Sequence, residues 1–180
     1  ASTGGPKAIE YIITRLPATL PAGVIIVQHM PEGFTKSFAE RLNTLSQLEV
    51  KEAEEGDEIQ TGRVIIAPGN RHLRIIGGRI ILSDGEKINN VRPAADPMME
   101  SGANEYGSNT MGIILTGMGV DGARGMAAIK KHGGKTIAQD RESSVVFGMP
   151  RAAIELGAVD VVVPLVDIPR TILRTLETMI

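Results

Sequence analysis

Ser2, His29 and Asp121 are of the three residue types that together carry out nucleophilic acyl transfer. In that chemistry the serine Oγ attacks a carbonyl carbon, the imidazole takes the serine proton, and the carboxylate holds the imidazole in the required tautomer. We expect each of the three in a turn beside a strand or helix end, and in an open parallel sheet the turns that follow the strands meet at one edge. The residue types and their positions therefore indicate a hydroxyl nucleophile with a histidine base.

The sequence around each residue favours this placement. Ser2 opens a glycine-rich turn, residues 2–6, that leads into a predicted helix, where the N-terminal N–H groups would stabilise developing negative charge. His29 directly follows an aliphatic run, and Asp121 lies in a second glycine-rich turn, residues 117–122, between a predicted strand and a predicted helix. The chain order Ser, His, Asp and the lack of a G-x-S-x-G sequence around Ser2 do not fit the α/β-hydrolases.

Each of these residues also has a purely structural interpretation. Ser2 and Asp121 are both of types that cap helix N-termini, and His29 alone could be a buried, hydrogen-bonded imidazole. His132 is expected to interact with a helix C-terminus, and His72 is expected on the surface or in a hairpin. Because the three histidines have no metal-ligand spacing, the sequence predicts no metal site and no cofactor.

A nucleotide-binding interpretation is also open on local pattern. Gly117-x-Gly119-x-x-Gly122 matches the dinucleotide fingerprint, and Asp140 lies eighteen residues after Gly122, where an acidic ribose ligand would be expected. The motif leaves only 58 residues of chain after Gly122, too few for the usual pair of mononucleotide-binding halves. It also gives no role to Ser2 and His29.

The elements that must position these residues are predicted from short aliphatic runs that alternate with segments of helical period. This alternation is typical of an α/β fold, doubly wound around a mainly parallel sheet. Gly77-Gly78 joins two runs as a hairpin loop, which adds one antiparallel hairpin. The predicted strands are residues 24–28, 63–67, 72–76, 79–83, 111–116, 136–138 and 159–164. Helices are predicted from near Pro6, over 34–45, from near Ala123 to the glycines at 133–134, and after Asp167 as an N-cap.

Composition limits the class of protein. The chain has 180 residues, of which 42% are apolar and 22% charged, values typical of one globular domain. Its longest aliphatic run, residues 24–27, is far shorter than the roughly 20 apolar residues of a membrane span, so no membrane insertion is expected. A net charge of −2 without long charged blocks predicts no nucleic-acid partner, and the acidic residues 52–58 are expected in a solvated loop. With no cysteine and no secretory leader, a cytoplasmic location is the expectation.

Several blocks of sequence, in order along the chain, resemble the catalytic domain of the CheB family, the chemotaxis protein-glutamate methylesterases. Each block is short, but their joint occurrence is specific, and in this family the glycine-rich turn presents a catalytic carboxylate. The blocks are Ser2-Thr3-Gly4-Gly5, Gln28-His29-Met30-Pro31, residues 33–35, 38–42 and 67–69 with His72, Ile114 to Gly122, and Val146-Phe147-Gly148-Met149-Pro150.

The resemblance implies roles for five residues. Ser2 would be the nucleophile, His29 the general base and then the general acid, and Asp121 the group that orients His29. The backbone N–H of Met118 would be an oxyanion donor, with Thr3 as a supporting residue. The implied reaction is hydrolysis of γ-carboxyl methyl esters on glutamates of chemoreceptor cytoplasmic domains by a serine hydrolase, with deamidation of certain glutamines. The implied fold is a three-layer α/β/α sandwich.

The resemblance also implies parts that are not in this sequence. In the family, a strand leads into the Ser2 turn, and a linker and a receiver domain, phosphorylated by a histidine kinase, precede that strand. Residues 1–180 are therefore predicted to be a single catalytic domain, and without the leading strand we expect a gap in the sheet and a mobile Ser2. A non-catalytic module that binds receptors or a kinase through the same face is the alternative function.

Overall fold

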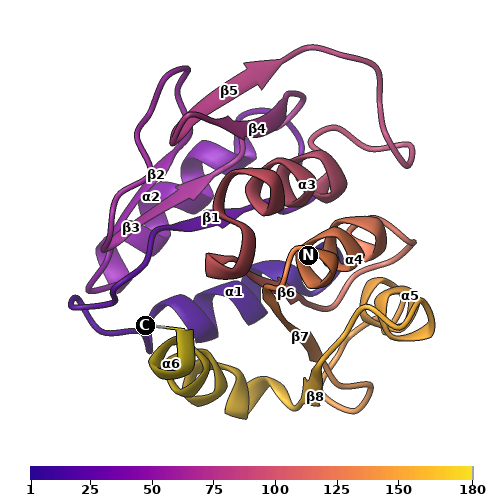
Figure 1. Cartoon of the computed structure of the whole chain (residues 1–180). Helices are drawn as coiled ribbons and strands as arrows, with labels where there is room; N and C mark the ends of the chain where they lie inside the picture. Colours follow the sequence, from indigo (N-terminus) through magenta and orange to yellow (C-terminus); the bar gives the residue numbers. More distant parts are fainter. Residues whose placement is uncertain (180) are drawn as a thin grey trace.

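The structure, a computed structural model, describes residues 1–179, in which strands and helices alternate (Figure 1). The parallel strands form two sheets of three strands each, ordered β1-β3-β2 and β6-β7-β8. A separate antiparallel hairpin, β4-β5, pairs Ile76 with Arg79 across its turn. The strands are β1 (Val24–Ile26), β2 (Glu49–Glu52), β3 (Arg63–Ile66), β4 (His72–Ile76), β5 (Arg79–Ser83), β6 (Met111–Ile114), β7 (Lys135–Gln139) and β8 (Val161–Val163).

Within residues 1–179, six α-helices cover the two faces of the sheets (Figure 1). They are α1 (Gly5–Ile13), α2 (Phe34–Leu45), α3 (Ala95–Tyr106), α4 (Ala123–Lys131), α5 (Met149–Glu155) and α6 (Ile168–Met179). Two short 3₁₀ helices span Gly107–Asn109 and Leu165–Asp167. No helix within residues 1–179 is both long and apolar enough to cross a membrane.

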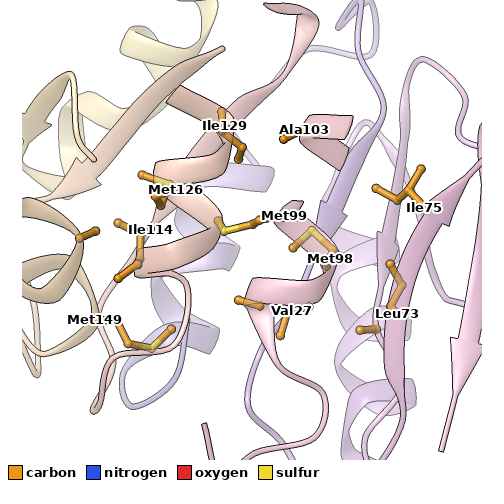
Figure 2. Packing of buried hydrophobic residues seen from close by; sticks show 14 of the residues in the cluster. Val27, Leu73, Ile75, Met98, Met99, Ala103, Ile114, Met126, Ile129 and Met149 are labelled. Carbon is orange, nitrogen blue, oxygen red and sulfur yellow. The ribbon is translucent and has the colours of Figure 1, made fainter. Parts of the chain in front are cut away.

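Successive side chains of each strand point to opposite faces of the sheet, and this divides the apolar core into two clusters. Val64 and Ile66 of β3 face one side and pack in a cluster with the apolar faces of α1, α2 and α6. Ile65 faces the opposite side, where the second cluster joins α3, α4, α5 and the hairpin (Figure 2). The arrangement is the predicted α/β fold with helices on both faces of mainly parallel sheets, and the predicted hairpin is confirmed residue for residue.

A gap separates the two parallel sheets. β1 and β6 are not paired with each other, and residues of both strands line an apolar cavity of about 250 Å³ between them. All residues of β1 are partly exposed, whereas Val64, Ile65 and Ile66 of the adjacent β3 are buried. The cavity therefore leaves one side of β1 without a neighbouring strand, and the gap expected in the sheet divides it into two half-sheets.

Several details of the sequence prediction are wrong or incomplete. The strand β2 and the helices α3 and α5 are not among the predicted elements, because β2 is a polar edge strand and α3 carries Pro97 and Gly102 within its span. His72 lies in the hairpin, as predicted, but it is not on the surface, because only 1% of it is exposed. Both ring nitrogens have partners: Nε2 contacts Glu86 O, and Nδ1 accepts from Ala94 N. Asp167 lies just before α6, but its carboxylate accepts from Arg170 instead of capping the helix.

Candidate functional site

The turn that carries Ser2 lies between the ends of the two half-sheets. The backbone N–H of Ser2 donates to Thr116 O (3.0 Å), just beyond β6, while Gln28 Nε2, just beyond β1, donates to Ser2 O (2.9 Å). Gly5 N also donates to Ser2 O (2.8 Å), which closes the turn into α1. The N-cap position of α1 is occupied by Gly4, with a φ of 81° and no side-chain cap. Ser2 is therefore not a helix N-cap, and the purely structural interpretation of this residue is wrong.

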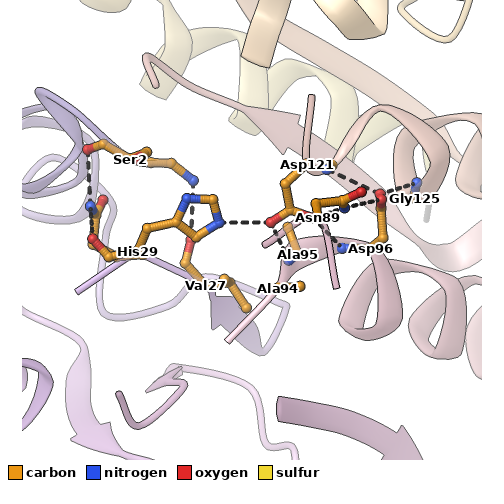
Figure 3. Close-up of polar contacts among 12 residues, drawn as sticks. Ser2, Val27, His29, Asn89, Ala94, Ala95, Asp96, Asp121 and Gly125 are labelled. Carbon is orange, nitrogen blue, oxygen red and sulfur yellow. Dashed lines mark hydrogen bonds and ion pairs between the residues drawn. The ribbon is translucent and has the colours of Figure 1, made fainter. Parts of the chain in front are cut away.

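His29 lies at the exit of β1, as the sequence predicts. Its backbone N–H donates to Ala1 O (3.0 Å), which ties it to the residue before Ser2. The imidazole is 11% exposed, and its Nε2 lies 2.7 Å from Asp121 Oδ2 (Figure 3). Because a carboxylate only accepts hydrogen bonds, Nε2 carries the proton in this contact and Nδ1 is left with a free lone pair in the neutral ring.

Four donors surround the Asp121 carboxylate, whose side chain is 3% exposed. Oδ2 accepts from His29 Nε2 and from Ala95 N (2.7 Å), while Oδ1 accepts from Asn89 Nδ2 (2.9 Å) and Asp96 N (3.2 Å). Burial favours a higher pKa for Asp121, but these hydrogen bonds outweigh burial and hold the pKa below its ordinary value of 3.8. Asp121 is therefore an ionised partner for His29, and it caps α3 instead of its own helix.

The imidazole is turned opposite to the usual serine protease arrangement. In that arrangement the aspartate binds Nδ1–H and Nε2 takes the serine proton. Here Asp121 binds Nε2, so Nδ1 is the nitrogen of His29 that could accept a proton. Within residues 1–179 the structure has no hydrogen bond between Ser2 Oγ and His29, and such contacts often tighten only when substrate binds.

The glycine-rich turn that carries Asp121 also contacts Ser2. A Cβ atom added to Gly117 would lie 2.8 Å from Ser2 Cβ, so glycine permits this close approach. Met118 follows with a side chain that is 68% exposed, and its backbone N–H makes none of the hydrogen bonds found among residues 1–179. Thr3 is exposed, and its carbonyl accepts from Thr116 Oγ1 (2.9 Å). The predicted oxyanion donor is thus beside the predicted nucleophile on an exposed turn.

The same turn argues against the dinucleotide interpretation. In that interpretation the N–H groups at the start of the following helix would bind a pyrophosphate. In this chain Gly122 N (3.0 Å) and Gly125 N (2.8 Å) already donate to the carboxylate of Asp96. Asp140, the expected ribose ligand, accepts instead from the backbone and side chain of Ser143.

A cleft of about 470 Å³ opens beside His29, with Met30, Pro31, Arg92 and Pro93 among its walls. His29 itself is one of its lining residues. No group of three or more His, Asp and Glu side chains within residues 1–179 is arranged to hold a metal ion.

Sequence reasoning missed three polar residues that build this site. Gln28 orients the Ser2 turn, Asn89 donates to Asp121, and the buried Asp96 holds the start of α4. Only Asn89 had a usable local signal, because the pair Asn89-Asn90 is typical of a tight turn. The others could not be found from the sequence, because their partners are distant along the chain.

Comparisons with known proteins point to one family. Residues 1–172 match the family described as CheB methylesterase. The chain is 52% identical over 181 residues to a protein of Pyrococcus abyssi named protein-glutamate methylesterase/protein-glutamine glutaminase, with 98% of this chain and 49% of the relative covered. A Sulfurimonas denitrificans protein of the same name is 54% identical over 172 residues, with 93% of this chain and 49% of the relative covered. The chain thus spans about half the length of these curated relatives.

A solved structure extends the similarity to the fold. The crystal structure of the Thermotoga maritima CheB methylesterase catalytic domain superposes with a TM-score of 0.92 at 48% sequence identity. The superposition covers 96% of this chain and 94% of that one. The α/β architecture with helices on both faces is therefore shared with a methylesterase catalytic domain.

Proposed function

Because the chain belongs to the CheB methylesterase family, we propose that it hydrolyses γ-carboxyl methyl esters of protein glutamates, with Ser2 as nucleophile. The observation that carries the proposal is the 2.7 Å contact of His29 Nε2 with the ionised Asp121, next to the turn that holds Ser2. The names of the relatives support the reaction and also support a second activity, deamidation of glutamine side chains.

The first half of the reaction forms an ester between enzyme and substrate. His29 Nδ1 takes the proton of Ser2 Oγ as this oxygen attacks the γ-carbonyl carbon. The substrate oxygen then carries a negative charge, which the backbone N–H of Met118 would stabilise, with Thr3 as a supporting residue. This role is supported by the lack of a partner for that N–H among the hydrogen bonds of residues 1–179. The C–O bond to the methoxy group breaks, and the imidazolium returns its proton to the leaving oxygen, which departs as methanol.

The second half releases the product. Water attacks the glutamyl ester of Ser2 while His29 Nδ1 accepts a water proton, and the same proton then returns to Ser2 Oγ as the ester bond breaks. The products are a glutamate side chain and free Ser2. Asp121 stabilises the imidazolium in both halves, since its charge lies 2.7 Å from Nε2. Deamidation follows the same steps with ammonia as the leaving group.

The biological setting follows from the resemblance and stays a proposal. The substrates would be cytoplasmic domains of chemoreceptors, which places the chain in the cytoplasm. Control by a receiver domain, phosphorylated by a histidine kinase, would belong to a part of such proteins outside residues 1–180.

Methanol release from a methyl-esterified receptor fragment tests the proposal. The comparison is between the parent chain, Ser2→Ala and Ser108→Ala, an exposed serine that serves as the matched control. We expect release by the parent and Ser108→Ala, and loss of at least about 10⁴-fold in kcat for Ser2→Ala. Equal release by Ser2→Ala would contradict the role of Ser2, and a folded parent that releases no methanol would favour the non-catalytic binding module.

A further inference from the structure

Asn89 joins two buried aspartates. Its Nδ2 lies 2.9 Å from Asp121 Oδ1 and 2.8 Å from Asp96 Oδ2 (Figure 3). An amide nitrogen has two hydrogens to donate and a carboxylate only accepts, so both contacts identify this atom as nitrogen. Both amide hydrogens of Asn89 are therefore used on carboxylates, and one of these carboxylates is the partner of His29.

The backbone conformation at Asn89 allows its amide group to reach both aspartates. Ile88 and Val91 exchange two backbone hydrogen bonds of 3.1 Å, which closes a tight two-residue turn. The residues within it, Asn89 and Asn90, have φ values of 54° and 63°. Asparagine is among the few residues other than glycine that adopt such values readily. The turn directs the Asn89 amide group toward the aspartates, although much of the residue is exposed.

The two aspartates cap each other's helices. Asp121, just before α4, accepts from Ala95 N and Asp96 N at the start of α3. Asp96, within the first turn of α3, accepts from Gly122 N and Gly125 N at the start of α4. Each carboxylate thus lies at the positive end of the other's helix, which stabilises its negative charge. Asn89 bridges the pair, because its Nδ2 donates to Oδ1 of Asp121 and to Oδ2 of Asp96, the Asp96 oxygen that the start of α4 does not use.

From this geometry we propose that Asn89, held by Asp96, is a positioning residue that fixes the Asp121 carboxylate so that Oδ2 faces His29 Nε2. The proposal rests on the proposed esterase function for its kinetic meaning. Asn89 touches neither Ser2 nor the His29 ring in the hydrogen bonds of residues 1–179, so it acts through Asp121. Without this donor, Oδ1 would keep only the 3.2 Å contact to Asp96 N, while Oδ2 keeps its contacts to Ala95 N and His29 Nε2. The carboxylate would then be held firmly on one oxygen only, and its orientation toward the imidazole would be less well fixed.

Replacement by glycine distinguishes the effect of the Asn89 amide group from the effect of the turn. Asn89→Gly keeps a residue that tolerates the positive φ and removes both hydrogen bonds. Asn90→Gly is the matched control, because it makes the same change at the neighbouring position, whose side chain makes none of the hydrogen bonds found in residues 1–179. We expect kcat for methanol release to fall about 10- to 100-fold in Asn89→Gly, by analogy with the loss of a partner that orients a metal-binding side chain, with KM unchanged. Asn90→Gly should stay within about threefold of the parent, and equal effects of the two variants would overturn the proposal.

Replacement by aspartate provides a pH-dependent test. Asn89→Asp keeps the shape and the tolerance of positive φ but places a third carboxyl group against Asp96 and Asp121. Two neighbouring carboxylates raise the pKa of the introduced group, so lowering the pH protonates it and returns an O–H donor. The deficit in kcat relative to the parent should therefore be larger at pH 8 than at pH 5.5. A deficit that does not change with pH would contradict the proposed role of the hydrogen bond that residue 89 donates to Asp121.

A readout independent of turnover separates this proposal from the esterase function. The proton on His29 Nε2 lies in a short hydrogen bond to Asp121. It should therefore give a far-downfield proton NMR signal in ¹⁵N-histidine-labelled protein. We expect this signal in the parent and in Asn90→Gly, and its broadening or loss in Asn89→Gly with circular dichroism unchanged. If the parent releases no methanol, this signal still tests whether Asn89 positions the Asp121 carboxylate. An unchanged signal in Asn89→Gly would contradict the positioning role whatever the activity.

Discussion

At the scale of single residues, the central feature is the direction in which Asp121 holds His29. The contact at Nε2 leaves Nδ1 unpaired within residues 1–179, so in the proposed mechanism the ring would do the same chemistry with its nitrogens exchanged. The Asp121 carboxylate remains charged because four donors offset the cost of its burial. These donors come from residues 89–96 and from the exit of β1, so the charge at the site depends on two distant parts of the chain.

Asp121→Asn tests the electrostatic part of this description through stability. The folded-state pKa of Asp121 lies below its unfolded value of 3.8, so its ionisation stabilises the fold above that value and the contribution is lost as the pH falls through the folded pKa. The free energy of unfolding of the parent should exceed that of Asp121→Asn most at neutral pH, and the difference should narrow below pH 3.8. Urea unfolding of both proteins from pH 7 to pH 2 measures it. A difference that is constant with pH would show that the carboxylate charge does not contribute.

The sequence indicated Ser2, His29 and Asp121 because each adjoins a recognisable strand end or turn. It did not indicate how they are oriented. The use of Nε2 by Asp121 depends on donors such as Ala95 N and Asn89 Nδ2, which reach the site only through tertiary packing. Local sequence therefore locates reactive residues at turns, while their hydrogen-bond partners emerge from the fold.

At the scale of elements, the site depends on how closely the Gly117 turn approaches Ser2. A Cβ atom on Gly117 would collide with Met149 Sδ and lie 2.8 Å from both Ser2 N and Ser2 Cβ. Gly117 N also donates to Val146 O, and Gly117 O accepts from Met149 N, so the turn cannot shift freely. Any side chain at this position must displace Ser2 or the start of α5.

Gly117→Ala should therefore lower both stability and turnover. We expect a loss of about 1–3 kcal/mol in the free energy of unfolding, as for overpacked sites, and a clear fall in kcat. Gly102→Ala is the control, because its Cβ would meet Ile75 Cδ1 at 3.5 Å, an ordinary contact, in the interior of α3. That change should raise stability by about 0.5–1 kcal/mol through helix propensity. The idea fails if thermal unfolding and kinetics rank the two variants in the opposite order.

Periodicity predicted the elements that bury a continuous apolar face. The hairpin β4-β5 and the helix α2 were predicted with the observed bounds, since their patterns are local. β2 was missed because three of its residues are charged, as suits an edge strand with one buried side chain, Val50. α3 was missed because its buried residues include Asp96, Pro97 and Gly102, which are not typical of a helix core.

At the scale of the whole molecule, the two half-sheets and the cavity between them set the position of Ser2. Ala1 N donates to Val27 O and Ser2 N donates to Thr116 O, so these residues bridge the half-sheets at the edge where the site lies. Beyond this bridge, β1 and β6 are separated by the apolar cavity of about 250 Å³. The resemblance predicted a gap in the sheet, but the apolar character that the strand runs share could not show which strands lie on either side of it.

The cavity should bind small apolar molecules. An apolar cavity of this size is large enough for benzene, and a ligand that binds only the folded state raises its stability. We expect saturating benzene to raise the Tm of the parent, with a smaller rise in Ile113→Phe, in which the new side chain fills part of the cavity. Calorimetry with and without benzene measures both. An unchanged Tm in the parent would indicate that the space is closed or hydrated in solution.

The most direct test of the central claim, that Ser2 and His29 act as one unit in ester hydrolysis, is a double-mutant cycle. Methanol release would be measured for the parent, Ser2→Ala, His29→Ala and the double variant, each with native circular dichroism. Because each group is useless without the other, we expect either single change to lower kcat by about as much as both together. Losses that multiply in the double variant would show that the two residues act independently and would contradict the mechanism.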